Sequence, residues 1–198
     1  KNLKEQGYSF PLFNEYKSLR TRATLQIQQG CNHRCTFCII PFGRGDAVSL
    51  SIGDINQRLK RIIKYGFKEI TLTGIDLTSY GEDLLGKPRL GNLVKRILYD
   101  HPSLKRLRLS SIGPGEIDEE LFELMCFEDR LLPHFHLSIQ SGDNLILKRM
   151  KRRHTREDVI KLCQNIKKVR EILAKSLFST PSKTWKIISS SSTSLVFL

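Results

Sequence analysis

Strand-like and helix-like segments alternate along the chain. Apolar and polar residues alternate with a period of two in four segments, which predicts strands at residues 24–28, 69–73, 106–110 and 134–140. Apolar residues recur at helical spacing in the intervening segments, which predicts helices at 54–65, 90–99, 118–127 and 155 to about 173, with a short helix ending at Met150. This order predicts an α/β fold with about four βα units, a parallel sheet and right-handed crossovers.

Polar and glycine residues follow each predicted strand. In parallel α/β folds the functional site lies at the carboxyl ends of the strands, so these loops are expected to converge. The first loop carries Cys31, Cys35 and Cys38 in a C-x3-C-x2-C pattern. The later strand ends carry Thr73, Gly74, Ser110, Ser111 and Gln140.

The three clustered cysteines indicate a metal site. Thiolates suit iron–sulfur clusters, zinc or Cu(I). Iron–sulfur clusters are usually held by four cysteines, so three would leave one iron open. A zinc site completed by His33 and a group of unliganded thiols remain alternatives. Cys126 and Cys163 lie singly in predicted helices, where we expect buried apolar side chains, and the odd cysteine count argues against a secreted disulfide framework.

The cysteine loop also resembles a known family. Residues 31–45 read C-N-H-R-C-T-F-C-I-I-P-F-G-R-G, which resembles the methylthiotransferases of the radical S-adenosylmethionine (SAM) superfamily. The resemblance extends over residues 20–173. Residues 72–81, L-T-G-I-D-L-T-S-Y-G, and 106–112, R-L-R-L-S-S-I, resemble the bacterial branch that modifies N6-threonylcarbamoyladenosine beside the tRNA anticodon. Neighbouring branches act on isopentenyladenosine in tRNA or on a ribosomal protein.

This resemblance implies cofactors and roles. Cys31, Cys35 and Cys38 would hold a [4Fe-4S] cluster, and SAM would bind its open iron. One electron would cleave SAM to methionine and a 5′-deoxyadenosyl radical, and a methylthio group would replace hydrogen on an unreactive adenine carbon. The SAM-binding residues would be Phe37 against the cluster and adenine, Thr73 and Gly74 at the amino group, and Ser110, Ser111 and Gln140 near the ribose or carboxylate.

The charge balance points to a polyanionic partner. The chain has 33 Lys and Arg against 20 Asp and Glu, a net charge of +13, which favours RNA, although solvated surface is the alternative for any one charge run. The candidate RNA contacts are Arg44, Lys148, Arg149, Lys151, Arg152 and Arg153. No apolar run of about 18 residues and no signal-like start are present, so we expect a cytoplasmic protein without membrane contact.

The domain organisation departs from the resembled family. We expect residues 1–20 to be a linker from a missing N-terminal domain, 21–174 to be an incomplete radical SAM barrel, and 175–198 to be a Ser-rich tail, disordered or out of the family's reading frame. We expect no counterpart here of the family's second-cluster domain and C-terminal RNA-binding domain. We therefore expect that this chain alone does not methylthiolate tRNA, a reaction that also needs an electron donor and a sulfur source.

Two other classes of function stay open from the sequence. One is a non-catalytic RNA-binding module with a structural metal site, and the other is a degenerate gene product without function.

Overall fold

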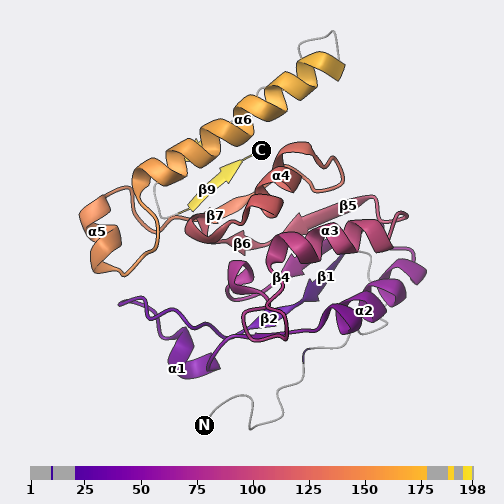
Figure 1. The fold of residues 1–198 in the computed structure, drawn as a ribbon, viewed down its shortest axis with the longest axis horizontal. Coiled ribbons are helices and arrows are strands. Elements are labelled where there is room, and N and C mark those ends of the chain that lie inside the picture. Colours follow the sequence, from indigo (N-terminus) through magenta and orange to yellow (C-terminus); the bar gives the residue numbers. More distant parts are fainter. Residues whose placement is uncertain (1–9, 11–20, 178–186, 190–193, 198) are drawn as a thin grey trace.

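The fold is a curved layer of strands with helices packed along one side (Figure 1). The computed structural model describes residue 10 and residues 21–177, 187–189 and 194–197. The strands are β1 Arg22–Gln26, β2 Gln28–Gln29, β3 Val48–Ser49, β4 Glu69–Thr73, β5 Arg106–Leu109, β6 Ser111–Ile112, β7 His136–Ser138, β8 Ile187–Ser189 and β9 Ser194–Phe197. The helices are α1 Ile40–Arg44, α2 Ile52–Lys64, α3 Leu90–Asp100, α4 Glu119–Phe127, α5 Asn144–Arg149 and α6 Arg156–Leu177, with short 3-10 turns η1 Leu77–Ser79 and η2 Pro114–Glu116.

The predicted parallel sheet is confirmed. β4 lies between β1 and β5 and is parallel to both, and β6 is parallel to β7. Ile70 and Leu72 of β4 have no exposed surface, as expected for a central strand of a sheet that helices cover. In the described part of the chain the sheet remains open, with β1 at one edge, so the structure is a partial barrel.

Four helices form the layer that covers the sheet. α2 packs beside α3, α3 beside α4, and α4 beside α6. Ile55, Leu59 and Ile62 of α2 recur at helical spacing and are fully buried. Side-chain caps fix two of the helix starts: Ser51 accepts a hydrogen bond from the Asp54 backbone, and Asp118 accepts one from Leu121. The predicted helices are therefore confirmed with small changes at their ends.

The first predicted strand, residues 24–28, is interrupted at Ile27. The Ile27 backbone N–H donates to the Thr73 carbonyl, and the Ile27 carbonyl accepts from the Leu50 N–H. At this residue the chain therefore leaves β4 and turns to β3, which pairs antiparallel with β2. Alternation of apolar residues could not show this change of partner, because the pattern continues through it.

Two further strands also differ from the prediction. The strand predicted at 106–110 is divided at Ser110, where the chain changes its neighbour from β4 to β7. The strand predicted at 134–140 is reduced to β7. Pro133 precedes it and the His134 N–H bonds back to the Leu132 carbonyl, while Gln140 ends it with a left-handed φ of 76°. Proline and left-handed backbone both interrupt strand pairing.

The described parts of the Ser-rich tail contribute two strands that the pattern did not predict. β9 pairs antiparallel with β7, and β8 pairs antiparallel with β9. The antiparallel direction differs from that of the parallel units before it. The predicted linker lies outside the described residues apart from Phe10, which is buried in the core.

None of the described helices is both long enough and apolar enough to cross a bilayer.

One ion-pair group joins the amino ends of two central strands. Glu69 on β4 is 2.6 Å from the guanidinium Nε atoms of both Arg106 and Arg108 on β5. Burial of the Glu69 carboxyl acts to raise its pKa, but the hydrogen bonds and charges of the two arginines hold that pKa below its ordinary value. The carboxylate form therefore stabilises the β4–β5 pairing.

We predict that Glu69→Gln lowers the free energy of unfolding at neutral pH by about 1 kcal/mol, a modest value because Arg106 is half exposed. A depressed pKa contributes stability above the ordinary glutamate pKa of about 4.3, and that contribution is lost as the pH falls through the folded-state pKa. The difference between the two proteins in urea unfolding should therefore shrink below about pH 4. The exposed Glu123→Gln on α4 is the control, and a pH-independent difference for Glu69→Gln would contradict the prediction.

Candidate metal centre

The cysteine loop begins at a glycine that no other residue can replace. Gly30 has a φ of 69°, and a Cβ built on it would lie 2.0 Å from the Asp46 carbonyl oxygen. This close approach allows the Cys31 N–H to donate to the Gly45 carbonyl, and Asn32 accepts a bond from the Ala47 N–H. The loop from Gly30 is thus closed against the chain that follows α1.

A buried glutamine joins this loop to the next strand end. Gln28 has no exposed surface. Its Nε2 donates to the Gly30 carbonyl at 2.9 Å, and its Oε1 accepts from the Asp76 N–H at 2.8 Å. A Cβ on Gly74 would lie 2.9 Å from the same Oε1, so Gly74 makes room for this amide. Gln28 therefore fixes where the cysteine loop lies relative to the loop after β4.

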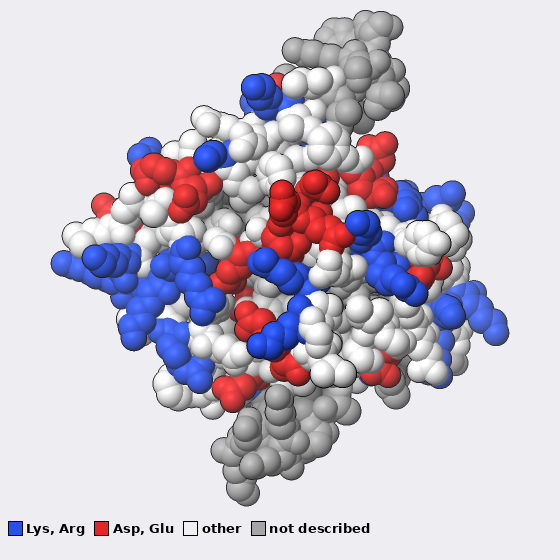
Figure 2. Space-filling view, in the orientation of Figure 1, with Lys and Arg blue, Asp and Glu red and all other residues white. Residues whose placement is uncertain are grey.

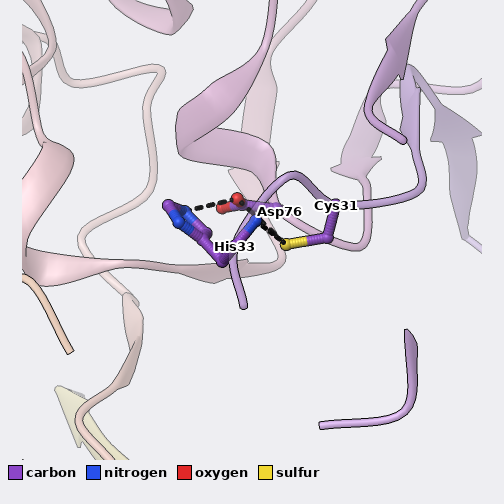
Figure 3. Close-up of side chains that lie close together, drawn as sticks. All are labelled: Cys31, His33 and Asp76. Atoms are coloured by element: carbon purple, nitrogen blue, oxygen red, sulfur yellow. Dashed lines mark hydrogen bonds and ion pairs between the residues drawn. The ribbon is translucent and has the colours of Figure 1, made fainter. Parts of the chain in front are cut away.

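Cys31, His33 and Asp76 meet at this junction (Figure 3). One ligand atom from each residue lies within 4.8 Å of the others. The Asp76 carboxylate is 2.9 Å from His33 Nε2 and 3.6 Å from Cys31 Sγ. Asp76 also accepts hydrogen bonds from the hydroxyls of Thr78 and Ser79 in η1. A carboxylate, an imidazole and a thiol so arranged are donors suited to a divalent ion such as zinc.

His33 is held by two carboxylates. Its Nε2 lies 3.1 Å from Glu116 of η2 as well as 2.9 Å from Asp76. These two hydrogen bonds raise the pKa of the His33 imidazole to about 10. Burial would raise the pKa of Asp76, but the bonds from His33 and Ser79 lower it below its ordinary value. The chain therefore holds His33 as a cation between two anions.

The three predicted cysteines line one cavity of about 240 Å³. Cys31 is buried, while Cys35 and Cys38 are partly exposed. Burial raises the pKa of the Cys31 thiol to about 12, so a metal must displace a firmly held proton there. Among the described residues, the three sulfur atoms are not all within 4.8 Å of one another. One zinc ion held by all three thiolates would need them closer together, because zinc–thiolate bonds are only about 2.3 Å long.

The outer part of the loop is attached to α5 and the segment after it. Thr36 donates from its hydroxyl to the Arg149 carbonyl at 3.2 Å and from its backbone to the Met150 carbonyl. Arg152 donates to the Ser138 carbonyl at 2.7 Å and lies 3.7 Å from Cys35 Sγ. The cavity is therefore bounded by chain segments distant in sequence.

The structure brings together only part of the predicted SAM-binding set. Phe37, Ser111 and Gln140 line the cavity, whereas Thr73, Gly74 and Ser110 do not. The Ser111 hydroxyl is 2.7 Å from His136 Nδ1. Thr73 bonds through its carbonyl to Ile27, and the Ser110 hydroxyl is buried without a hydrogen-bond partner. The roles suggested for these residues toward SAM stay predictions.

The predicted RNA contacts divide into two kinds. Arg152 is partly buried at the cavity through the two contacts above. The others are exposed: Arg44, Lys148, Arg149, Lys151 and Arg153, of which Lys151 and Arg153 also line the cavity. Arg153 reaches Glu116 at 3.2 Å.

Sequence reasoning missed several groups of the site. Asp76, Glu116, Ser138 and His154 line the cavity, and Gln28 lies behind it. Asp76 and Glu116 follow predicted strands, and their position at strand ends is the signal that could have identified them. Gln28 gave a weaker signal, a polar residue at the end of an alternating segment.

Comparison with known proteins identifies the class. Residues 25–175 match the radical SAM superfamily, and the chain belongs to it. The chain is similar to two solved structures of the radical SAM methyltransferase TsrM of Kitasatospora setae. One structure, with tryptophan and a SAM analog bound, has a TM-score of 0.57 at 16% identity, and one with cobalamin and a [4Fe-4S] cluster has 0.54 at 17%. The two matches cover 75% and 72% of this chain, and 29% and 28% of the TsrM chains. At this low sequence identity they show only that the fold is shared.

Sequence relatives narrow the similarity further. The chain is 53% identical over 151 residues to the threonylcarbamoyladenosine tRNA methylthiotransferase MtaB of Rickettsia prowazekii and 41% identical to that of Bacillus subtilis. It is 37% identical to the tRNA-2-methylthio-N(6)-dimethylallyladenosine synthase of Clostridium tetani. These matches cover 76%, 70% and 74% of this chain, which spans only 36%, 30% and 32% of the relatives.

Membership of the superfamily implies a [4Fe-4S] cluster and SAM. The donor set of this chain fits the cluster, because three thiols from one loop border one cavity and the remaining groups there are mostly hydrogen-bonded to one another. His33 in particular is held by carboxylates. The assignment of the cluster to Cys31, Cys35 and Cys38 stays a prediction, and the zinc site completed by His33 stays its alternative.

We predict that Gln28→Met lowers the free energy of unfolding by about 3 kcal/mol, because the Gly30 carbonyl and the Asp76 N–H lose their partner. Urea unfolding of the cluster-free protein measures this value. Gln57→Met, at an exposed position of α2, is the matched control and should change stability by less than about 0.5 kcal/mol. Equal effects of the two substitutions would show that Gln28 does not hold the loop.

Proposed function

We propose that this chain is the radical SAM core of a methylthiotransferase that adds a methylthio group to N6-threonylcarbamoyladenosine beside the anticodon of tRNA. The observation that carries the proposal is the convergence of Cys31, Cys35 and Cys38 on one cavity at the strand ends. The greater identity to two threonylcarbamoyladenosine enzymes than to a dimethylallyladenosine synthase supports this branch. The ribosomal-protein substrate of the third branch has no such support.

The chain's residues divide the work at this site. Cys31, Cys35 and Cys38 would hold the cluster, and a reduced cluster with bound SAM supplies the one-electron chemistry that opens an unreactive C–H bond. Phe37, Ser111 and Gln140 line the space beside the sulfurs, where they could contact SAM. Asp76 and Glu116 orient His33, and Arg152 places a positive charge 3.7 Å from Cys35.

The positive charge has a physical use. A cluster bound by thiolates is an anionic group, and positive charge in a poorly solvated site stabilises it. His33 lies within the cysteine loop, where its imidazole is bonded to Asp76 and Glu116, and Arg152 reaches Cys35 from the segment after α5. They offset the negative charge of Asp76 and Glu116, which border the same cavity.

The reaction also needs partners. We propose tRNA as the substrate, an electron donor that reduces the cluster, and a sulfur source for the methylthio group. The strong positive charge of the chain agrees with a tRNA partner.

Anaerobic reconstitution of the chain with iron and sulfide tests the core chemistry. We predict broad visible absorption and, with a strong reductant, formation of 5′-deoxyadenosine from SAM. Cys31→Ala, Cys35→Ala and Cys38→Ala should each lose both signals, because each removes one cluster ligand. Cys163→Ala, which removes a buried thiol on α6, should keep both. Stoichiometric zinc with no SAM cleavage would support the structural-metal module instead.

A chimera tests the substrate. Residues 21–174 would replace the matching segment of the Bacillus subtilis relative, and tRNA from cells lacking that relative would be analysed by mass spectrometry. We predict that 2-methylthio-N6-threonylcarbamoyladenosine is restored, because the segment supplies the cluster site, and that the same chimera with Cys35→Ala restores none. Restored methylthiolation of isopentenyladenosine alone would overturn the choice of substrate.

A further inference from the structure

An unusual group of exposed apolar side chains lies at α1, beside the cysteine loop. Phe42 is 79% exposed, Ile39 is 74% exposed and Phe37 is 53% exposed. Phe37 also lines the cavity of the three cysteines. Single exposed apolar residues are common, but three within six residues at the rim of a site indicate a surface that meets a partner.

Exposed positive side chains lie on the same helix and at the end of the helix that the cysteine loop contacts. Arg44 ends α1, Lys148 and Arg149 end α5, and all three are exposed. The cysteine loop that precedes α1 reaches the end of α5, because Thr36 bonds to the carbonyls of Arg149 and Met150. Figure 2 shows Lys and Arg gathered on this side of the molecule, over α5 and α1. Phe42 shares α1 with Arg44, and Phe37 follows Thr36, which bonds to the end of α5, so the exposed rings lie on segments that carry or contact these cations.

The molecule offers a contrast on another helix. Phe127 at the end of α4 is 60% exposed, and the residues around it include Glu120, Glu123 and Glu128. Figure 2 shows Asp and Glu gathered over that region. An aromatic ring among carboxylates repels a polyanion, whereas the same ring among Lys and Arg attracts one. Phe42 and Phe127 are both exposed aromatic side chains, but the charges around them differ in sign.

Aromatic rings within a basic surface are the arrangement by which proteins bind unpaired nucleotides. Bases stack on the ring faces, and the cations contact the phosphates on either side. A regular duplex cannot use exposed rings in this way, because its bases are already stacked. The surface therefore fits unpaired RNA, such as a loop, better than a helix.

We propose that Phe42 is a stacking platform for an unpaired base of the RNA substrate, close to the reacting nucleotide, and that Arg44, Lys148 and Arg149 contact the adjoining phosphates. This inference rests on the proposed function, since it takes RNA to be the substrate. Because Phe37 lies at the rim of the cavity, the platform is beside the cavity. A nucleotide that leaves the loop of the RNA could therefore enter the cavity. Arg152 is excluded from this surface because it donates to Ser138 and faces Cys35.

RNA binding by the cluster-free chain tests the platform. Fluorescence anisotropy would compare a labelled RNA hairpin that has an unpaired loop with a blunt duplex of the same base composition. Phe42→Ala should weaken hairpin binding about tenfold, the effect of losing one base stack, and leave duplex binding unchanged. Phe42→Trp should retain hairpin affinity. Phe127→Ala is the matched control and should bind the hairpin like the wild type.

A second set of variants tests the phosphate contacts. Replacing Lys148 and Arg149 with Gln should weaken hairpin binding and reduce its dependence on salt, because fewer counterions are released. Replacing Lys60 and Lys64, exposed on α2, with Gln supplies a control of equal charge change. Circular dichroism verifies that each variant folds.

Several results would overturn the proposal. These are unchanged hairpin binding by Phe42→Ala, an equal loss for hairpin and duplex, and a change of oligomeric state in Phe42→Ala, which would make the surface a contact between copies of the chain. The binding assay needs neither cluster nor SAM. Absence of SAM cleavage by the reconstituted wild-type chain therefore overturns the proposed reaction alone. Normal SAM cleavage together with unaltered hairpin binding by Phe42→Ala overturns the platform alone.

Discussion

The site depends on one buried amide. Gln28 begins β2, two residues after the end of β1, and its side chain joins the Gly30 carbonyl at the start of the cysteine loop to the Asp76 N–H beyond β4. Buried backbone groups must be paired, and here one side chain pairs two of them from different strand ends. The position of Cys31 relative to Asp76 follows from this connection. Catalytic groups on loops are positioned accurately only when a rigid element holds the loops. Here the sheet holds the cysteine loop through the Gln28 side chain.

Charge balance is the second constraint on the site. Two carboxylates, Asp76 and Glu116, lie at the cavity that the cysteines line. Unpaired, they would oppose an anionic cluster. His33 is bonded to both, and Arg153 reaches Glu116 as well. These bonds neutralise the two carboxylates. They also connect the cysteine loop with η1, η2 and the segment before α6.

Periodicity predicted much of this fold. The helices and β4 follow from patterns within single segments, such as Ile55, Leu59 and Ile62 on one helical face. The changes at Ile27 and Ser110 could not be predicted, because they depend on which strand lies alongside. The cysteines were predictable because their chemistry is specific to their spacing, whereas Gln28 and Glu116 act through contacts distant in sequence. Thr73 and Gly74 lie at the predicted strand end, yet the backbone there faces Ile27 and Gln28.

The antiparallel strand β9 has a consequence for how the sheet can grow. It pairs with β7 along residues His136–Ser138, at the edge where a barrel of repeated units would continue with a parallel strand. Any polypeptide that supplies such a strand in trans must first displace β9. The paired strands β8 and β9 therefore block this edge of β7. Self-association of the chain through that edge requires β9 to dissociate first.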